Sequence, residues 1–371
     1  MSLEPANLAG RLLPWFDAHG RHDLPWQADP APYRVWISEV MLQQTQVETV
    51  KSYYQRFIAR FPDVAILAAA PQDEVMRLWS GLGYYARARN LHRAAGEIVT
   101  RHGGELPDTL EALMDLPGIG RSTAGAILAL ARGQRHPILD GNVKRVLARV
   151  FLVEEAAESA AGQKRLWSLS EAATPEARVA AYTQAIMDLG ATVCTRANPA
   201  CDRCPLAQGC AALAAGRVAD LPASRRRAPR RRRRTHMMFI VAAGRVLLER
   251  RPPRGIWGGL WAPPEFTLAV EAEASLAARF GLAAPTRRLA AVRHAFTHFD
   301  LEIEPWIVEL GTQEARIAEG EARWQELASI ADVGLPAPVA KLLEELRHGA
   351  NGPVRETRPR GGRPREAPVP G

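Results

Sequence analysis

The chain has 371 residues, a hydrophobic content of 47% and a formal net charge of +8 at pH 7. This length and this content are enough for two domains with separate cores. No apolar run approaches the roughly 20 residues of a membrane helix, and residues 1–6 lack the basic and apolar regions of a signal peptide. A membrane or secreted protein is therefore not expected, and we expect a cytoplasmic one.

An all-helical domain is predicted for residues 1–224. Apolar residues recur there with a helical period, in segments separated by short breaks, and strand-like alternation is almost absent. The predicted helices cover residues 34–45, 47–60, 73–82, 86–102, 110–115, 122–131, 142–153, 163–173 and 180–189.

A glycine-rich turn with the sequence LPGIG, at residues 116–120, joins two of these helices. Gly118 and Gly120 allow a tight turn and a close approach to another chain, and the free amides at the start of the next helix suit a phosphate. The pattern over about residues 110–132 is typical of a helix-hairpin-helix that contacts the DNA backbone, with an ordinary turn as the alternative. Asp140 follows twenty residues after Gly120, where it can also cap the next helix.

All four cysteines of the chain, Cys194, Cys201, Cys204 and Cys210, lie in one short loop, with gaps of six, two and five residues. Four soft thiolates around one point indicate a metal centre. Disulfides suit small secreted chains instead. Zinc is the other alternative, but structural zinc sites usually pair two close-spaced couples, and here only one Cys-x-x-Cys is present. The uneven gaps favour a cubane iron-sulfur cluster.

Most of the positive charge lies outside the two predicted domains. Residues 225–234 read RRRAPRRRRR, whereas residues 1–224 hold 23 basic and 23 acidic side chains and residues 235–346 hold 11 and 15. Such a run cannot bury itself, and its charges repel one another. It predicts a basic linker at residues 225–235 that lies on or near a polyanion, with a solvated spacer as the alternative.

Beyond the linker, the pattern changes to short apolar stretches, which predict strands at residues 238–243, 246–249 and 301–308 and helices near 271–280 and 338–346. We therefore predict an α/β domain over residues 236–346. The Gly-, Pro- and Arg-rich tail, residues 347–371, is predicted to be disordered.

Three further stretches carry a family resemblance: SEVMLQQTQV at 38–47, GLGYYARARN at 81–90 and LDGNVKRVL at 139–147. Together with the hairpin, Asp140 and the cysteine loop, they resemble the endonuclease III superfamily of DNA glycosylases, and more closely the adenine DNA glycosylases of the MutY type. The resemblance covers about residues 8–346. It implies a monomeric, monofunctional enzyme that removes adenine from A:8-oxoG or A:G mispairs in double-stranded DNA, associated with the nucleoid in a bacterium. It also implies one [4Fe-4S] cluster held by Cys194, Cys201, Cys204 and Cys210, and no nucleotide cofactor.

Two carboxyl groups would catalyse the reaction that the resemblance implies. Glu39 lies among apolar residues, which favour its neutral form if it faces a pocket. The resemblance implies that it donates a proton to N7 of adenine, that Asp140 stabilises the oxocarbenium ion of the sugar, and that Asn142 orients Asp140 or the sugar. A polar helix stripe is the alternative for Glu39, because it shares a face with Gln43 and Gln46.

Ser122 distinguishes this chain from the superfamily members that also cut the strand. Those members carry a lysine at this position, just inside the helix after the hairpin, and the lysine forms a Schiff base. The serine therefore predicts release of the base alone. Lys144 is nearby, on the next predicted helix. A bifunctional glycosylase and lyase for oxidised pyrimidines is the alternative function, which Ser122 disfavours.

Several further residues are implied to bind the DNA. Because a paired base cannot reach a pocket, the nucleotide must be flipped out and the gap filled. The resemblance places Gln44 and Tyr84 near the opposite base, with Gln43 close by, and makes Arg87 and Arg89 candidate phosphate contacts. The alternatives are a core position for Tyr84 and a solvated face for the arginines.

The C-terminal domain resembles a Nudix fold that has lost its metal site. Gly259, Glu265 and the pair Gly281-Leu282 match the Nudix segment, but the positions of the magnesium-binding carboxylates read ASLAAR at 274–279. No catalytic magnesium is therefore expected. A Nudix pyrophosphohydrolase fused to a DNA-binding module, the alternative from another class of function, is disfavoured for the same reason.

A tripeptide in this domain, Phe296-Thr297-His298, matches the family's Phe-Ser-His loop for recognition of 8-oxoguanine. Threonine keeps the hydroxyl, which can accept the N7 hydrogen that 8-oxoguanine has and guanine lacks. The added methyl group changes the fit. An ordinary surface loop is the alternative.

Overall fold

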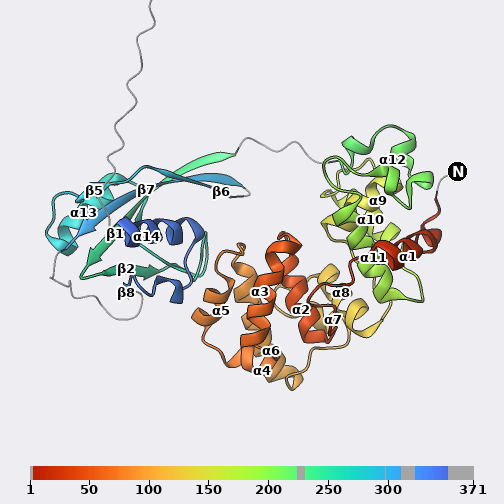
Figure 1. Cartoon of the computed structure of the whole chain (residues 1–371), viewed down its shortest axis with the longest axis horizontal. Coiled ribbons are helices and arrows are strands. Elements are labelled where there is room, and N and C mark those ends of the chain that lie inside the picture. Colours follow the sequence, from red (N-terminus) through yellow and green to blue (C-terminus); the bar gives the residue numbers. More distant parts are fainter. Residues whose placement is uncertain (1–2, 224–229, 297, 311–321, 350–371) are drawn as a thin grey trace, which may run out of the picture. The chain divides into compact units, whose positions relative to one another are not determined.

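The computed structural model describes residues 3–223, 230–296, 298–310 and 322–349 (Figure 1). The contacts divide them into two compact units. The first holds the described residues up to 231 together with residues 251–260, and the second holds residues 232–250 and the described residues from 261 onward. Within the described part of the chain, none of the helices has the length and apolar character to cross a membrane.

The first unit is helical, as predicted. Its helices are α1 (Leu8–His19), α2 (Pro32–Leu42), α3 (Val47–Arg60), α4 (Val64–Ala69), α5 (Gln72–Trp79), α6 (Ala86–His102), α7 (Leu110–Met114), α8 (Arg121–Arg132), α9 (Gly141–Val150), α10 (Ala160–Ala173), α11 (Val179–Thr192) and α12 (Ala211–Ala214), with short 3-10 turns η1 (Pro5–Asn7), η2 (Cys201–Arg203), η3 (Ala207–Gly209) and η4 (Val218–Asp220).

Three of these helices were not among the predicted segments: α12, which has only four residues, and the two longer helices α1 and α4. Helix α1 contains Pro14 in its interior, a residue that usually ends a helix. Helix α4 has six residues, which is too short for a periodic pattern, although its N-cap Asp63 accepts a hydrogen bond from the Ile66 amide at 2.8 Å. Both helices bury apolar side chains in the core, and this tertiary packing outweighs the local signal.

The predicted helix-hairpin-helix is formed by α7, the turn and α8. Gly118 has a φ of +82°, and a Cβ atom built there lies 2.8 Å from Cβ of Asn90 on α6. Only glycine fits this position without strain. Gly120 is the N-cap of α8, and both glycines are exposed.

The second unit is built on one sheet with the strand order β3-β2-β1-β7-β5, in which β4 pairs with β1, β6 with β7 and β8 with β2. Two helices, α13 (Ala269–Phe280) and α14 (Ala337–Gly349), accompany the strands β1 (Arg231–Ala242), β2 (Arg245–Arg250), β3 (Trp261–Ala262), β4 (Glu265–Phe266), β5 (Arg287–Arg288), β6 (Val292–Ala295), β7 (Phe299–Glu309) and β8 (Ala322–Glu326), and η5 (Ile330–Asp332) precedes α14. The α/β prediction is confirmed. A core cluster joins the strands to α13 through Met238, Ile240, Leu247, Leu276 and Trp306.

The structure shortens the predicted linker. Strand β1 begins at Arg231, so the last arginines of the run are strand residues, and α14 continues to Gly349, past the predicted boundary at residue 346. The strand forms among like charges because β7 offers acidic partners: Arg234 contacts Glu302 and Glu304, each at 3.2 Å. Residues 224–229 of the linker region and 350–371 of the tail lie outside the described residues.

Candidate active site and cysteine cavity

The helical unit contains a cavity of about 140 Å³ into which α2, α8, α9 and α11 contribute side chains. A single water needs only about 10–15 Å³ measured in this way, so the cavity has room for a larger group. We call it the carboxyl cavity, and it is lined by Arg21, Leu24, Trp26, Glu39, Leu42, Gln43, Thr45, Val47, Ser122, Thr123, Asp140, Asn142, Gln184, Met187 and Ala191. It thus brings together five predicted site residues, Glu39, Gln43, Ser122, Asp140 and Asn142.

Glu39 lies on α2 and is half-buried. Removal from water, followed by the negative charge of Asp140, raises the pKa of Glu39 from an ordinary value of 4.5 to about 8. Among the described residues, no side chain or amide donates a hydrogen bond to this carboxyl group. At neutral pH it is therefore mostly protonated and can donate a proton.

Asp140 has the opposite surroundings, because it is the N-cap of α9. Its Oδ1 accepts a hydrogen bond from the Val143 amide at 2.7 Å, and its Oδ2 accepts one from Nδ2 of Asn142 at 3.2 Å. Burial raises the pKa of Asp140, while these donors and the charge of Arg145 oppose the rise. The helix N-terminus also favours the anion. Of the two carboxyl groups, Asp140 is therefore the one whose contacts favour a carboxylate.

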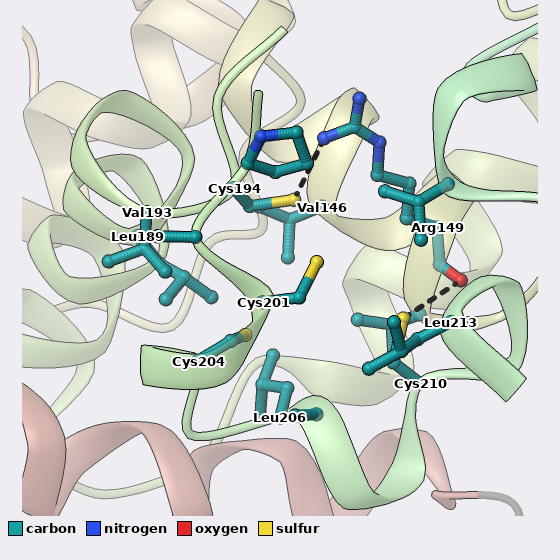
Figure 2. Close-up of a pocket in the computed structure, with 15 residues that line it drawn as sticks. Val146, Arg149, Leu189, Val193, Cys194, Cys201, Cys204, Leu206, Cys210 and Leu213 are labelled. Carbon is teal, nitrogen blue, oxygen red and sulfur yellow. Dashed lines mark hydrogen bonds between the residues drawn. The ribbon is translucent and has the colours of Figure 1, made fainter. Parts of the chain in front are cut away.

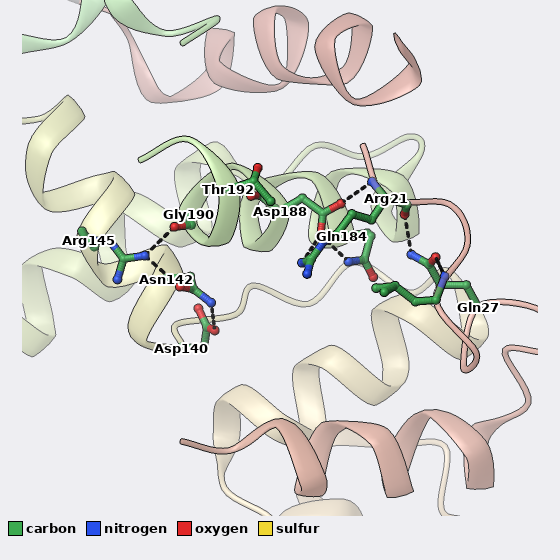
Figure 3. A network of polar contacts seen from close by, with 10 residues as sticks. Arg21, Gln27, Asp140, Asn142, Arg145, Gln184, Asp188, Gly190 and Thr192 are labelled. Carbon is green, nitrogen blue, oxygen red and sulfur yellow. Dashed lines mark hydrogen bonds and ion pairs between the residues drawn. The ribbon is translucent and has the colours of Figure 1, made fainter. Parts of the chain in front are cut away.

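Asn142 is itself held by Arg145, a residue that the sequence analysis did not single out (Figure 3). The Arg145 guanidinium donates to Oδ1 of Asn142 at 2.8 Å, to the Gly190 carbonyl at 2.5 Å and to the Cys194 carbonyl at 2.7 Å. Contacts thus run from the first cysteine through Arg145 and Asn142 to Asp140.

A second polar group missed by the sequence analysis lies on the α11 side of the cavity (Figure 3). The side chain of Asp188 is 1% exposed. It accepts hydrogen bonds from Nε and Nη2 of Arg21 at 3.0 and 2.5 Å and from Nε2 of Gln184 at 2.8 Å. Arg21 and Asp188 are separated by 167 residues, so no local pattern could pair them. The sequence does contain one sign of this pair: Asp188 is the lone acid in the apolar stretch AIMDLG of α11, and a buried acid needs a partner.

Ser122 and Lys144 differ in their relation to the cavity. The Ser122 hydroxyl accepts a hydrogen bond from the Leu139 amide at 2.9 Å and thereby holds the segment that leads to Asp140. Lys144 lies on α9 and is half-buried, and its side chain is not part of the lining. Gln43 donates to Thr123 at 3.2 Å across the cavity wall.

The structure corrects the expectation for Arg87. Its side chain is buried, and its guanidinium donates to the carbonyls of Val40 and Met41, each at 2.8 Å, and to Gly83 at 3.0 Å. It therefore satisfies carbonyls at the end of α2, the helix that carries Glu39, instead of facing a phosphate. Arg89 is half-buried and donates to the Gly258 carbonyl.

Gln44 and Tyr84 both have unusual backbone conformations. Their φ angles are +58° and +49°, a region that non-glycine residues seldom adopt, and both side chains are exposed. Such strain is typical of functional sites. In the second unit, Phe296 is half-buried and His298 is exposed, whereas Thr297 lies outside the described residues.

The four cysteines line a second cavity, the cysteine cavity, whose remaining walls are largely apolar (Figure 2). All four thiols are free. Burial raises the pKa of Cys204 to about 11 and also raises the pKa values of Cys201 and Cys210, and the charges of neighbouring cysteines add to the rise. Four thiolates there consequently need a cationic group to be stable.

Arg149 supplies part of that positive charge. It is 2% exposed, and its guanidinium donates to Sγ of Cys194 at 3.4 Å and to the carbonyls of Thr195 and Leu221 at 2.7 and 2.9 Å. In the described part of the chain, no three His, Cys, Asp or Glu side chains lie close enough to share a single metal ion. The donor set itself, four soft thiolates on one short loop, is of the type that holds an iron-sulfur cluster.

The helix-hairpin-helix and the carboxyl-lined cavity define the class of base-excision DNA glycosylases. Residues 37–172 match the family model "HhH-GPD superfamily base excision DNA repair protein", and residues 236–345 match a NUDIX domain. A thermostable thymine-DNA glycosylase has a similar structure, with a TM-score of 0.51 and 26% identity, over 56% of this chain and 95% of that one.

Two relatives narrow the class further. The adenine DNA glycosylase of Buchnera aphidicola subsp. Schizaphis graminum is 36% identical over 335 residues, which are 90% of this chain and 96% of that protein. The adenine DNA glycosylase of Mus musculus is 35% identical in an alignment 402 positions long, which covers 91% of this chain and 78% of that protein. This chain belongs to the adenine DNA glycosylase family.

Proposed function

We propose that the protein hydrolyses the N-glycosidic bond of adenine in A:8-oxoG and A:G mispairs of double-stranded DNA and leaves an abasic site. The observation that carries this proposal is the unlike pair of carboxyl groups in the carboxyl cavity, Glu39 with a pKa of about 8 and Asp140 at a helix N-terminus. Cleavage needs an acid for the leaving base and a negative charge beside the sugar cation, and this pair supplies both.

The reaction begins when the adenine nucleotide is flipped out of the duplex into the cavity. The protonated Glu39 donates to N7 of adenine, which makes the base a better leaving group, an effect of roughly 10² to 10⁴ in rate. The Asp140 carboxylate stabilises the oxocarbenium ion that develops on the sugar as the bond to the base breaks. A water molecule then attacks C1′ of this ion, which gives the abasic site and releases a proton that restores the acid form of Glu39. Asn142, held by Arg145, fixes the position of Asp140.

Other residues hold the DNA during this step. We assign the exposed amides around Gly118 and Gly120 to the phosphate backbone, because the start of α8 offers free N–H groups. Exposed Gln44 and Tyr84 are assigned to the gap and the opposite base. Phe296, Thr297 and His298 of the second unit are assigned to 8-oxoguanine. We place the protein, as a monomer, with the DNA in the cytoplasm or nucleoid.

The cysteine cavity is assigned to one [4Fe-4S] cluster, with Cys194, Cys201, Cys204 and Cys210 as ligands. When bound, the cluster supplies positive charge to four half-buried thiolates and joins the two ends of the loop. The loop then presents exposed Arg196 and Arg203 to DNA phosphates.

The assignment of Glu39 is tested with Glu39→Gln. The amide keeps the size of the side chain but has no acidic proton, so we expect lesion binding to be retained and adenine release to fall by roughly 10² to 10⁴. Single-turnover cleavage is measured on duplexes with A opposite 8-oxoG, G, C and T. Glu48→Gln, the same change at an exposed glutamate of α3, should leave all rates unchanged. A cleavage rate in Glu39→Gln equal to that of the wild-type protein would contradict the assignment of Glu39 as the acid.

A further inference from the structure

Four side chains of the second unit form a continuous stack near the turn between β6 and β7. Cζ of Arg233 lies 4.5 Å from the ring centroid of Phe299. The rings of Phe299 and Phe296 are stacked at 4.7 Å with an interplanar angle of 21°, and His294 meets Phe296 edge-on at 4.8 Å. We call this group the aromatic stack. The Phe296 amide donates to the Phe299 carbonyl at 2.8 Å and closes the turn.

The stack lies on the face of β7 opposite the acidic side chains. Successive strand residues point to opposite faces, so Phe299 shares a face with buried Leu301 and Ile303, while Glu302 and Glu304 lie on the other. Arg234 and Arg293 contact Glu302 at 3.2 and 3.5 Å there. In the described part of the chain, Arg233 has no ion pair with an acid.

This environment distinguishes Arg233 from Arg234, which contacts acids on the other face of β7. Its side chain is exposed, yet the guanidinium rests on a half-buried ring. A cation over a ring face is attracted by the ring quadrupole. The contact therefore limits the motion of both Arg233 and Phe299, and Phe299 in turn supports Phe296. Aromatic rings beside a guanidinium are also the surface on which nucleic-acid bases stack.

We propose that Arg233 is a positioning residue for lesion recognition, which holds Phe299 and thereby Phe296 in place against the base opposite adenine. This rests on the proposed function, because it concerns the choice between 8-oxoguanine and guanine. A residue that only attracts phosphate strengthens binding of both duplexes equally. A positioning residue changes the ratio between them.

The test is Arg233→Gln, compared with Arg232→Gln. Both substitutions remove one positive charge from neighbouring exposed positions of β1, but Arg232 points to the other face. Affinity and single-turnover rate are measured on A:8-oxoG and A:G duplexes at one salt concentration. We expect Arg233→Gln to lower the preference for A:8-oxoG by about two- to five-fold, the range of an exposed cation–π contact. Arg232→Gln should weaken both complexes equally.

Two further variants separate positioning from charge. Arg233→Lys keeps a cation over the ring and should restore part of the preference. Arg233→Gln combined with Phe299→Leu should lower the preference no more than Phe299→Leu alone, because both changes break the same contact. Thermal unfolding of each variant checks that the second unit is folded.

The outcomes are distinct. An unchanged preference in Arg233→Gln, a shift equal to that of Arg232→Gln, or additive effects in the double variant would overturn the positioning role. Failure of the wild-type protein to release adenine from either duplex would instead overturn the proposed function.

Discussion

At the scale of single residues, the two carboxyl groups of the carboxyl cavity are kept unlike by their surroundings. The carboxyl group of Glu39 is removed from water, and no described residue donates a hydrogen bond to it. Asp140 lies at a helix N-terminus and accepts hydrogen bonds from Asn142 and Val143. The same contrast of environments separates acid from anion in glycosidases. Burial is the largest cause of the rise in both pKa values, so the difference between the two groups comes from the donors and the charge of Arg145 that act on Asp140.

The pKa of Glu39 leads to a pH prediction. Because the acid form is required, the single-turnover rate should fall about tenfold per pH unit above pH 8. Stability should follow the same group. Its pKa is raised from 4.5 to about 8 on folding, so its stabilising contribution is complete below pH 4.5 and is lost as the pH rises through 8.

Glu39→Gln provides the control for this pH dependence. The amide does not titrate, so the variant should unfold at a higher temperature than the wild-type protein above pH 8, with a smaller difference near pH 5. Melting curves across this range check the sign. An equal or lower melting temperature of the variant at high pH contradicts the burial of Glu39.

Ser122 carries a prediction about reaction type. Ser122→Lys places an amine in the carboxyl cavity and should add strand cleavage at the abasic site, detected by borohydride trapping and by strand scission. The substitution also removes the acceptor of the Leu139 amide, so a stability loss of about 1 kcal/mol is expected. Ser122→Ala is the control, with the same loss of the bond and no amine. Absence of trapping in the folded lysine variant would contradict only the idea that the residue at position 122 sets the reaction type.

At the scale of elements, the cysteine loop is tied to the rest of the helical unit by two arginines of α9. Arg149 donates to Cys194, Thr195 and Leu221, and Arg145 donates to Cys194 and Asn142. The four cysteines share one cavity, but Glu39 and Asp140 line another. The loop can therefore affect DNA binding without taking part in bond cleavage.

Anaerobic removal of iron tests this division. The loop should lose its ordered structure, and affinity for the lesion duplex should fall by at least tenfold, because Arg196 and Arg203 are no longer held in position. The single-turnover rate at saturating protein should fall less, since the loop reaches the carboxyl cavity indirectly, through Arg145 and Asn142. Iron content, hydrogen exchange of residues 194–210 and duplex binding are measured together. Lesion binding that is unchanged in the iron-free protein would refute the role of the loop.

Element boundaries show where local patterns are insufficient. Helix α9 could be placed from its N-cap, because Asp140 is a short polar side chain before an apolar period. The start of strand β1 could not, although residues 238–243 were predicted as a strand, because a run of arginines predicts a solvated linker. It forms a strand from Arg231 because β7 supplies Glu302 and Glu304 for Arg234 and the ring of Phe299 for Arg233.

At the scale of the whole molecule, two units carry separate tasks. The helical unit holds the carboxyl cavity, the hairpin and the cysteine cavity. The second unit has the Nudix-like sheet, and the magnesium positions 274–279 lie on α13 without a carboxylate. Its remaining task in the proposed function is recognition of the base opposite adenine.

The sequence alone determined the features that depend on residue type and short spacing. These are the helical and α/β domains, the four clustered cysteines, the hairpin glycines and the lack of carboxylates at positions 274–279. Each follows from local chemistry, such as a helical period, the conformational freedom of glycine or the number of available carboxylates.

Only the tertiary structure decided the features that depend on neighbours distant in the chain. It buried Arg87 against α2, paired Arg21 with Asp188, and brought Glu39 into the same cavity as Asp140. It also placed Arg233 on Phe299. The reason is physical: a pKa, a buried charge or a stack is set by lost water and by nearby atoms, and sequence order does not specify either.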